Sequence, residues 1–344
     1  MRLLRPVLPA LLAASLLTPA LPASAADIPS RHVDPEAIST GKPPTTPFLD
    51  VKRQAIVDDS GRTALRGETV GRVREVHRNS ADGWVAASSS LNHTAVYRVS
   101  LDGQLTPLIG DRENPTIHVD ESRVVQAIYP NNRPDLIAAV YDVATGDRIA
   151  RIHGRWIEVH DYRDGLVWMT LQREQKSPER LVTWDPDPDE IVNQGRRGID
   201  GVDLDRGAAW KFRGLRKVRV IPLGDNADWE AWTSNGFIDV DPAFSPDGEK
   251  VVTYTRRKIG RDTAVYPGSM VVRDADSGEA MRKFNGAPTG DETVWENNKR
   301  FVSAFWGSPG TGADRASHVR LTTSGGAHRV SPFYPWPLLR TWVQ

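Results

Sequence analysis

Two short stretches place an imidazole beside a carboxylate, the combination that acid–base catalysis and metal binding use. In HVDE, His118 precedes Asp120 and Glu121, and in VHDY, His160 directly precedes Asp161. On a β-strand, His118 and Asp120 would share one face, an arrangement that a metal ion could use. Neither stretch has the H-E-x-x-H spacing that places two metal ligands on one face of a helix. We interpret these residues as solvated loop or strand-end residues.

Acidic stretches offer a second kind of chemistry, because alternating carboxylates are common in calcium loops. DPDPDE at residues 185–190 and DVDP at residues 239–242 alternate in this way. Both lack the twelve-residue pattern and the terminal bidentate glutamate of a calcium loop. Asp-Pro pairs are equally typical of turns, which is the interpretation we adopt. Paired carboxylates for glycoside hydrolysis could come from separate parts of the chain, and one sequence does not pair them.

The remaining motifs are less specific. GSPGTGADR at residues 307–315 is rich in glycine but lacks the Lys-Ser/Thr that grips phosphate, so it predicts a loop. There is no G-x-S-x-G nucleophile motif in the chain. Asn92 begins an Asn-His-Thr glycosylation acceptor. The sequence therefore assigns no catalytic residue, no cofactor-binding residue and no metal ligand, and it predicts no cofactor.

One stretch, WKFRGLRKVRV at residues 210–220, is strongly basic. Its basic residues, which could meet an anionic polymer or a cell-wall surface, are Lys211, Arg213, Arg216, Lys217 and Arg219. We interpret the stretch as an exposed, alternating pair of strands. Over the whole chain, 44 basic residues balance 44 acidic ones, so nothing favours nucleic acid or an anionic membrane as a partner.

The N-terminus is the clearest targeting signal. Arg2 and Arg5 precede an apolar run that ends in Ala23–Ala25, an A-x-A cleavage pattern, so residues 1–25 are predicted to be a signal peptide. The alternative is an uncleaved anchor, but the run is short for a membrane span and is broken by prolines. The chain has no cysteine and can form neither a disulfide nor a lipid-modified N-terminus. We expect an exported protein, secreted or in the cell envelope (extracellular or periplasmic), with no membrane insertion after cleavage.

The rest of the chain divides into an arm and one large domain. Residues 26–47 are polar and rich in proline, which predicts a linker or an extended arm over the domain surface. Residues 48–344 contain no further linker and are expected to form one domain. Their frequent, scattered prolines and glycines indicate many turns along a β-rich chain. No segment carries a sustained apolar stripe of helical period.

A repeat organises this domain. In DVDPAFSPDGEKVVTYTRR, residues 239–257, an SPDG turn is followed by a β-branched strand. The same order of strands and turns recurs with turn centres near residues 60, 102, 145, 186, 225, 276 and 325. Four short strands per period of about 40–50 residues is the signature of a β-propeller blade. An all-β sandwich or barrel would also have short strands but would not explain the period.

Closure of the ring sets the number of blades. We predict seven four-stranded blades, with six or eight as alternatives, closed by pairing of N- and C-terminal strands. The segment around residue 60 would supply two outer strands of the shared blade, and residues 331–344 the inner ones. Such closure removes open sheet edges. The residues that we expect to pack between blades are Trp84, Trp168, Trp210, Trp295, Trp306 and Trp342.

The stretch DPAFSPDGEKVVTYT resembles the SPDG repeat of TolB-type propellers, also called PD40 or WD40-like repeats. The matching residues are Phe244–Gly248 and the apolar pair Val251–Val252. The turns DVATGDR and DADSGEA look like those of WD40-like and quinoprotein-like propellers. The complete SPDG motif occurs once, and the other blades lack it. The resemblance implies a ring-shaped exported protein of a kind that binds other proteins or small ligands.

Two functions follow from this reading. The first is an exported, non-catalytic scaffold, expected to be a monomer, that binds an unknown protein or small-molecule ligand at one face or in the central channel. The alternative is an exported propeller hydrolase acting on carbohydrate or another polymer with channel carboxylates. A quinone-cofactor or metal-dependent propeller enzyme is a weaker third option. Acidic side chains clustered around the axis would favour an enzyme.

Overall fold

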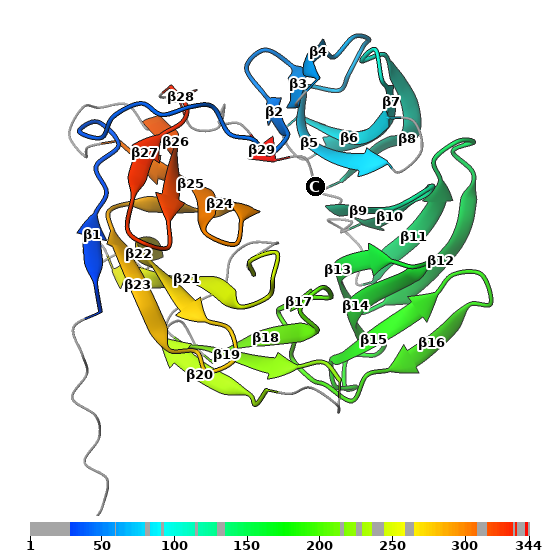
Figure 1. Ribbon diagram of the computed structural model, residues 1–344. Coiled ribbons are helices and arrows are strands. Elements are labelled where there is room, and N and C mark those ends of the chain that lie inside the picture. Colours follow the sequence, from blue (N-terminus) through cyan, green and yellow to red (C-terminus); the bar gives the residue numbers. More distant parts are fainter. Residues whose placement is uncertain are drawn as a thin grey trace, which may run out of the picture.

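In the computed structural model, the chain forms a seven-bladed β-propeller (Figure 1). Short strands joined by tight turns make seven sheets around one axis. The structure describes residues 28–58, 60–79, 83–90, 93–113, 116–128, 135–213, 217–224, 229–235, 244–258, 265–307, 315–332, 334–335 and 341–342. The elements in this part of the chain are all strands, and it contains no helix long and apolar enough to cross a membrane. The predicted all-β propeller with seven blades is confirmed.

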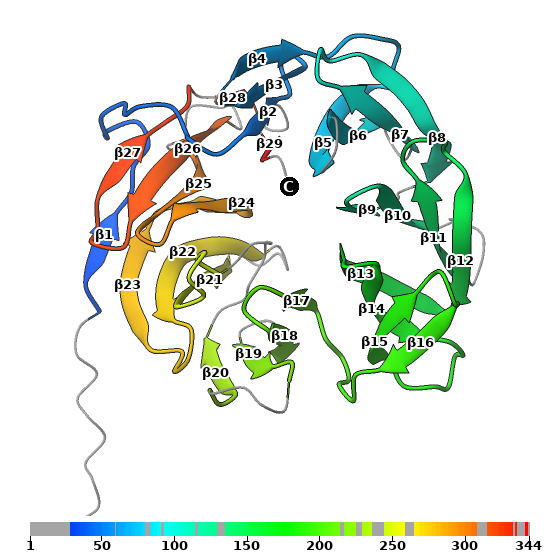
Figure 2. The ribbon, with the colours of Figure 1, turned by 45° about the vertical axis from the view of Figure 1, so that its right-hand side comes forward.

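The strands of blades 1 to 4 follow one another from the axis outward (Figure 2). Blade 1 contains β29 (Thr341–Trp342), β2 (Phe48–Asp50), β3 (Ala55–Asp58) and β4 (Gly61–Ala64). Blade 2 contains β5 (Arg72–Asn79), β6 (Gly83–Ser90), β7 (His93–Ser100) and β8 (Leu105–Glu113). Blade 3 contains β9 (Thr116–Asp120), β10 (Arg123–Ile128), β11 (Leu136–Asp142) and β12 (Arg148–Gly154). Blade 4 contains β13 (Trp156–Arg163), β14 (Leu166–Gln172), β15 (Arg180–Asp185) and β16 (Glu190–Asn193).

Blades 5 to 7 complete the ring. Blade 5 contains β17 (Gly201–Asp203), β18 (Ala208–Arg213), β19 (Lys217–Pro222) and β20 (Trp232–Asn235). Blade 6 contains β21 (Lys250–Lys258), β22 (Val265–Asp274), β23 (Ala280–Asn285) and, outermost, β1 (Ser30–His32). Blade 7 contains β24 (Pro288–Asn297), β25 (Arg300–Trp306), β26 (Arg315–Thr322) and β27 (Ala327–Arg329), with β28 (Tyr334–Pro335) also paired to β26. Neighbouring strands are antiparallel except β1, which pairs with β23 in parallel.

Both ends of the chain contribute to blade 1, as predicted, but in a different proportion. β29 pairs with β2 through Phe48↔Trp342 and Leu49↔Thr341, so the C-terminal segment supplies one strand and the N-terminal segment three. The predicted two-and-two division is wrong because a turn at residues 51–54 separates β2 from β3. Gln54 has φ +50° in this turn. The side chain of Trp342 lies outside the described residues.

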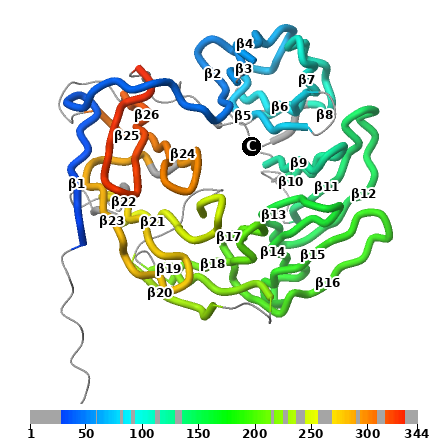
Figure 3. The backbone as a smooth tube through the Cα atoms, viewed as in Figure 1, coloured from blue at the N-terminus to red at the C-terminus, as the bar shows by residue number. Residues whose placement is uncertain are grey.

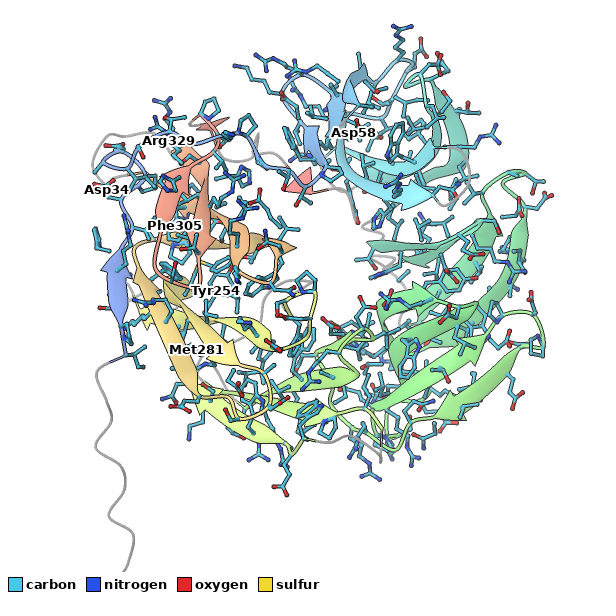
Figure 4. All side chains as sticks on the ribbon, viewed as in Figure 1. Asp34, Asp58, Tyr254, Met281, Phe305 and Arg329 are labelled. Carbon is cyan, nitrogen blue, oxygen red and sulfur yellow. The ribbon has the colours of Figure 1, made fainter. Side chains whose placement is uncertain are left out.

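Groups of buried apolar side chains fill the seams between neighbouring blades. Within the part of the chain that the structure describes, each of the seven seams has such a group, which combines residues of both blades. Between blades 6 and 7, Tyr254 and Phe305 are both fully buried, and Figure 4 shows them on the facing sheets. The blades are therefore held by hydrophobic burial between sheets as well as by the hydrogen bonds within each sheet.

Most of the tryptophans predicted to pack between blades do so. Trp84, Trp210 and Trp295 are buried in the seams of blades 1 and 2, 5 and 6, and 6 and 7. Trp168 is half-buried in the seam of blades 4 and 5. Trp306 differs, because it is half-buried against strands of its own blade.

The N-terminal arm lies along the outside of blades 6 and 7 before it enters blade 1 (Figure 3). β1 extends the sheet of blade 6, and Val33, directly after it, is 2% exposed within the seam of blades 6 and 7. Further along, Thr40 forms a bridge with Arg329 at the outer edge of blade 7. The arm thus covers two outer sheet edges that would otherwise be open to pairing with another chain.

A buried ion pair fixes the last part of the arm. Arg320 donates to Glu296 at 2.5 and 2.6 Å, and to the backbone carbonyls of Lys42 and Pro43 at 3.1 and 2.9 Å. Burial alone would raise the pKa of Glu296, but the hydrogen bonds from Arg320 and from the backbone of Thr45 hold it below its usual value. Since each nitrogen of the guanidinium and each oxygen of the carboxylate has a partner, the pair can stay charged inside the fold.

The SPDG turn adopts the predicted geometry. Gly248 has φ +70° and donates its N–H to the carbonyl of Ser245 at 2.7 Å. The Ser245 hydroxyl donates to Asp247 at 2.5 Å and accepts the backbone N–H of Lys250 at 3.0 Å. Serine, aspartate and glycine therefore each have a separate role in turning the chain into β21.

We predict that Gly248→Val lowers the free energy of unfolding by about 1–2 kcal/mol, because only glycine and asparagine adopt a positive φ readily. A Cβ at this position would also lie 2.9 Å from the Cδ of Arg206. Gly248→Asn is the matched control and should cost less. Urea unfolding of both variants measures the difference, and a Gly248→Val protein as stable as wild type would contradict the turn assignment.

Candidate functional site

Polar side chains gather on the innermost strands of blades 2, 3 and 4, which lie side by side around the axis (Figure 1, Figure 2). These strands, β5, β9 and β13, read RVREVHRN, TIHVD and WIEVHDYR. They carry His77, His118 and His160, three of the eight histidines in the chain. Together with Glu75 on β5, these three residues form what we call the histidine row.

Glu75 and His77 open the histidine row on blade 2. Their partners on β6 are Ala87 and Val85, which pack into the seam with blade 3, so the pair faces blade 3. His77 Nε2 donates to Glu75 Oε1 at 2.7 Å. Burial alone would raise the pKa of Glu75, but the charge and hydrogen bond of His77 lower it below its usual value. Glu75 is therefore an ionised carboxylate at neutral pH.

His118 continues the row on blade 3. Its partner on β10 is Val125, which packs against blade 4, and its ring N–H donates to the backbone carbonyl of Val159 on β13. Burial, helped by the nearby charge of His77, lowers the pKa of His118 to about 4, although Glu75 opposes this shift. His118 is thus a neutral imidazole at neutral pH.

His160 ends the row on blade 4, at a β-bulge in β13. Thr170 donates its hydroxyl hydrogen to the carbonyl of Ile199 at 3.0 Å, so it accepts the Nε2 hydrogen of His160 at 2.8 Å. This fixes the tautomer of the ring. Burial, followed by the nearby charge of His118, lowers the pKa of His160 to about 3.

The interpretation of His118 and His160 as solvated loop or strand-end residues is therefore wrong. Both lie within inner strands, and His160 is 9% exposed. The alternation of apolar and polar residues in TIHVD and WIEVH is the signal that could have placed them on strands.

A buried amide lies in the same seam as Glu75 and His77. Gln126 on β10 is fully buried, and it lies two residues from Val124, which packs in the seam of blades 2 and 3. Neither its Oε1 nor its Nε2 has a hydrogen-bond partner among the described residues. Each such group costs about 1–3 kcal/mol of stability, so a core built for stability alone would place an apolar side chain here.

A second group of polar residues lies where β13 and β17 begin. Trp156, the first residue of β13, is 44% exposed, and its indole N–H donates to the carboxylate of Glu158. Asp200 directly precedes β17 and accepts the backbone N–H of Phe212 at 2.6 Å. Burial raises the pKa of both carboxyl groups, and the charge of Asp200 raises that of Glu158 further. We call Trp156, Glu158 and Asp200 the Trp156 site.

Carboxylates at the opposite ends of the inner strands already have protein partners. Asp120 and Asp203 accept backbone N–H groups at 2.7 and 2.8 Å, and Arg163 pairs with Asp205 at 2.6 Å and with Asp161 at 3.4 Å. Within the described ranges, no group of three or more histidines and acidic residues is arranged to hold a metal ion. His118 and Asp120 do share a strand, but Asp120 accepts the N–H of Gly165 in the turn between β13 and β14.

The acidic stretch at residues 185–190 is a turn between β15 and β16, as its Asp-Pro pairs indicated. Trp184 Nε1 donates to Asp189 at 2.9 Å, and Arg123 pairs with Asp187 at 3.0 Å. Asp189 thus ties the turn to β15, and Asp187 links it to β10 of blade 3. The turn interpretation is confirmed.

The basic stretch at residues 210–220 is a pair of antiparallel strands, β18 and β19, with one buried face, as expected. Lys211 and Arg219 face each other across the pair. The acidic residues 239–242, most of the glycine-rich stretch 307–315 and Asn92 lie outside the described residues, as does the predicted signal peptide.

No family model matches this chain. No curated protein matches it either. A proposed 6-phosphogluconolactonase from Bacteroides fragilis NCTC 9343 has a similar structure, with 12% identity and a TM-score of 0.52, over 89% of this chain and 96% of the other. Another from Bacteroides uniformis ATCC 8492 has 14% identity and a TM-score of 0.51, over 84% and 94%. At this identity the likenesses support the propeller fold alone.

Acid should destabilise the protein through His118 and His160. Their pKa values of about 4 and 3 lie below the 6.5 of a free imidazole, so below about pH 6.5 the unfolded state binds more protons. Each histidine then removes about 2 kcal/mol of stability between about pH 7 and pH 5. Between pH 7 and pH 5, the free energy of unfolding measured in urea should fall by about 2 kcal/mol less in His160→Gln than in wild type. His153→Gln, on the exposed outer strand β12, should lose as much of its free energy of unfolding as wild type does. An equal loss in His160→Gln and wild type would contradict this assignment.

Gln126→Leu should stabilise the protein by about 1 kcal/mol or more, because it removes two buried polar atoms without partners and keeps the volume of the side chain. Thermal unfolding measures the change. Ser88→Ala is a useful contrast, because the buried Ser88 hydroxyl donates to the carbonyl of Val70 at 3.0 Å and its loss should destabilise. A lower melting temperature for Gln126→Leu would show that the amide has a structural partner.

Proposed function

We propose that this protein is an exported, non-catalytic propeller that binds a small polar ligand at the innermost strands of blades 2 to 4. The observation that carries the proposal is the histidine row, in which one ionised carboxylate and three imidazoles lie on adjacent inner strands. Neutral imidazoles donate and accept hydrogen bonds, and the carboxylate accepts them, so the row offers both kinds of partner to a polar molecule.

Blades 2 and 3 also carry groups that folding alone does not require. Gln126 has two buried atoms without a partner among the described residues, and Glu75 and His77 place a carboxylate and an imidazole beside an otherwise apolar seam. Proteins tolerate such costs where binding depends on them. Export is supported by the composition of residues 1–25, and amino-terminal sequencing of the protein from the envelope or the medium should begin at Ala26.

A hydrolase is the second candidate, and the Trp156 site is the observation that favours it. Glu158 and Asp200 are neighbouring carboxyl groups, and a carboxyl group with a raised pKa can act as a general acid. Release of reducing ends from a polysaccharide by the purified protein, lost in Glu158→Gln, would favour this candidate over a binding protein.

Nuclear magnetic resonance of the histidine rings tests the binding proposal. The mature chain, residues 26–344, would be titrated with a neutral sugar, a phosphate ester, a carboxylic acid and an amine. At least one probe should shift the imidazole signals of the histidine row, and Glu75→Gln with His77→Asn should weaken that binding about tenfold. His153→Asn, on the exposed outer strand, is the matched control and should bind as wild type does. If no probe moves these signals, the proposal is wrong.

A further inference from the structure

Trp156 is partly exposed to solvent on the innermost strand of blade 4. Its exposure of 44% is the largest among the described tryptophans, most of which are buried in seams. The hydrogen bond from its indole N–H to Glu158 orients the ring. An ordered, exposed tryptophan on a rigid strand is a feature of binding surfaces, because its large rigid surface loses little entropy on contact.

The ring of Trp156 has an acidic neighbourhood. Glu158 lies two residues along the same face of β13, and Asp200 lies where the adjacent inner strand begins. Glu179 adds a third negative charge near Glu158, and Lys211 supplies a positive one near Asp200. Among these neighbours the acidic groups outnumber the cation.

Each of the two nearest carboxylates still has acceptor capacity. The Asp200 hydrogen bond from the backbone of Phe212 is made by Oδ2, and Glu158 accepts the indole N–H of Trp156. A carboxylate has two oxygens and about four lone-pair directions, so both groups can accept further hydrogen bonds. A ligand with several N–H donors could therefore be held by both carboxylates.

We propose that the Trp156 site binds a small organic cation, with a guanidinium group as the best fit. A cation over the face of a tryptophan is attracted by the ring quadrupole, and a guanidinium also stacks flat on the ring. Its N–H groups match the spacing of carboxylate oxygens, and its charge offsets the acidic surplus. The inference rests on the proposed function in one respect, since it assigns a ligand class to the axis side of the ring.

This chemistry predicts a dependence on pH. A cation binds the ionised forms of Glu158 and Asp200, whose pKa values are raised by burial, so affinity should fall as the pH decreases below neutral. The charge of Glu179 acts on Glu158, and the charge of Lys211 acts on Asp200. His160, on the same strand, stays neutral because its pKa is about 3.

Calorimetry on the mature chain tests the proposal with three probes: methylguanidine, choline and 3,3-dimethyl-1-butanol, the uncharged isostere of choline. Methylguanidine should bind most tightly, choline more weakly, and the alcohol not measurably. Trp156→Ala should weaken methylguanidine binding by about tenfold or more, Trp156→Phe by less, and both Glu158→Gln and Asp200→Asn should weaken it. Met281→Ala is the matched control, because Met281 is also 44% exposed but lies on the outer part of blade 6 (Figure 4).

Three results would overturn the inference. They are equal binding of choline and its uncharged isostere, methylguanidine binding that Trp156→Ala leaves unchanged, and binding of an uncharged oligosaccharide such as cellohexaose in place of the cations. Failure here leaves the proposed function separately testable, because the histidine signals report on Glu75 and His77 rather than on Trp156. If methylguanidine binds through Trp156 while no probe moves those signals, the inference holds and the site proposed at the histidine row fails.

Discussion

The ring depends on one short pairing between the two ends of the chain. β29 contributes two residues, Thr341 and Trp342, which pair with Leu49 and Phe48 of β2. Without β29, the two ends of the chain would be joined, among the described residues, only through the apolar seam of blades 1 and 7 and the hydrogen bonds of the arm with blade 7. Since closing a long chain is entropically costly, the apolar seams around the ring must support this pairing. Closure in turn brings the inner strands of all blades to one axis.

The apolar seams and the polar groups of the histidine row lie in the same blades. The middle strands carry many of the apolar seam residues, such as Val85 and Ala87 on β6, and the inner strands carry others, such as Ile117 on β9. The innermost strands carry Glu75, His77, His118 and His160, and their burial disfavours charge on the last two. Rigid sheets thus position polar groups that would be poorly ordered on loops. The N-terminal arm adds to this rigidity by covering outer edges of blades 6 and 7.

The fold could be predicted from sequence because its middle strands are apolar and its turns are regular. The period of four strands predicted the seven sheets, and Gly248 has the positive φ that the SPDG turn required. The inner strands were missed because polar and charged residues interrupt their apolar ones, as in TIHVD. The histidine row brings together residues that are more than 80 positions apart in sequence, since it runs from Glu75 to His160. Only the arrangement of the blades around the axis shows that these residues lie on neighbouring strands.

The most direct test of the account is a crystal structure of the mature protein soaked with methylguanidine. Ligands should bind where the inner strands of adjacent blades meet and not at the outer edges of the blades. The account predicts a planar ligand stacked on Trp156, with hydrogen bonds to Glu158 or Asp200. Methylguanidine bound only at outer strands such as β12 or β16, or an unchanged Trp156 site in saturated crystals, would contradict it.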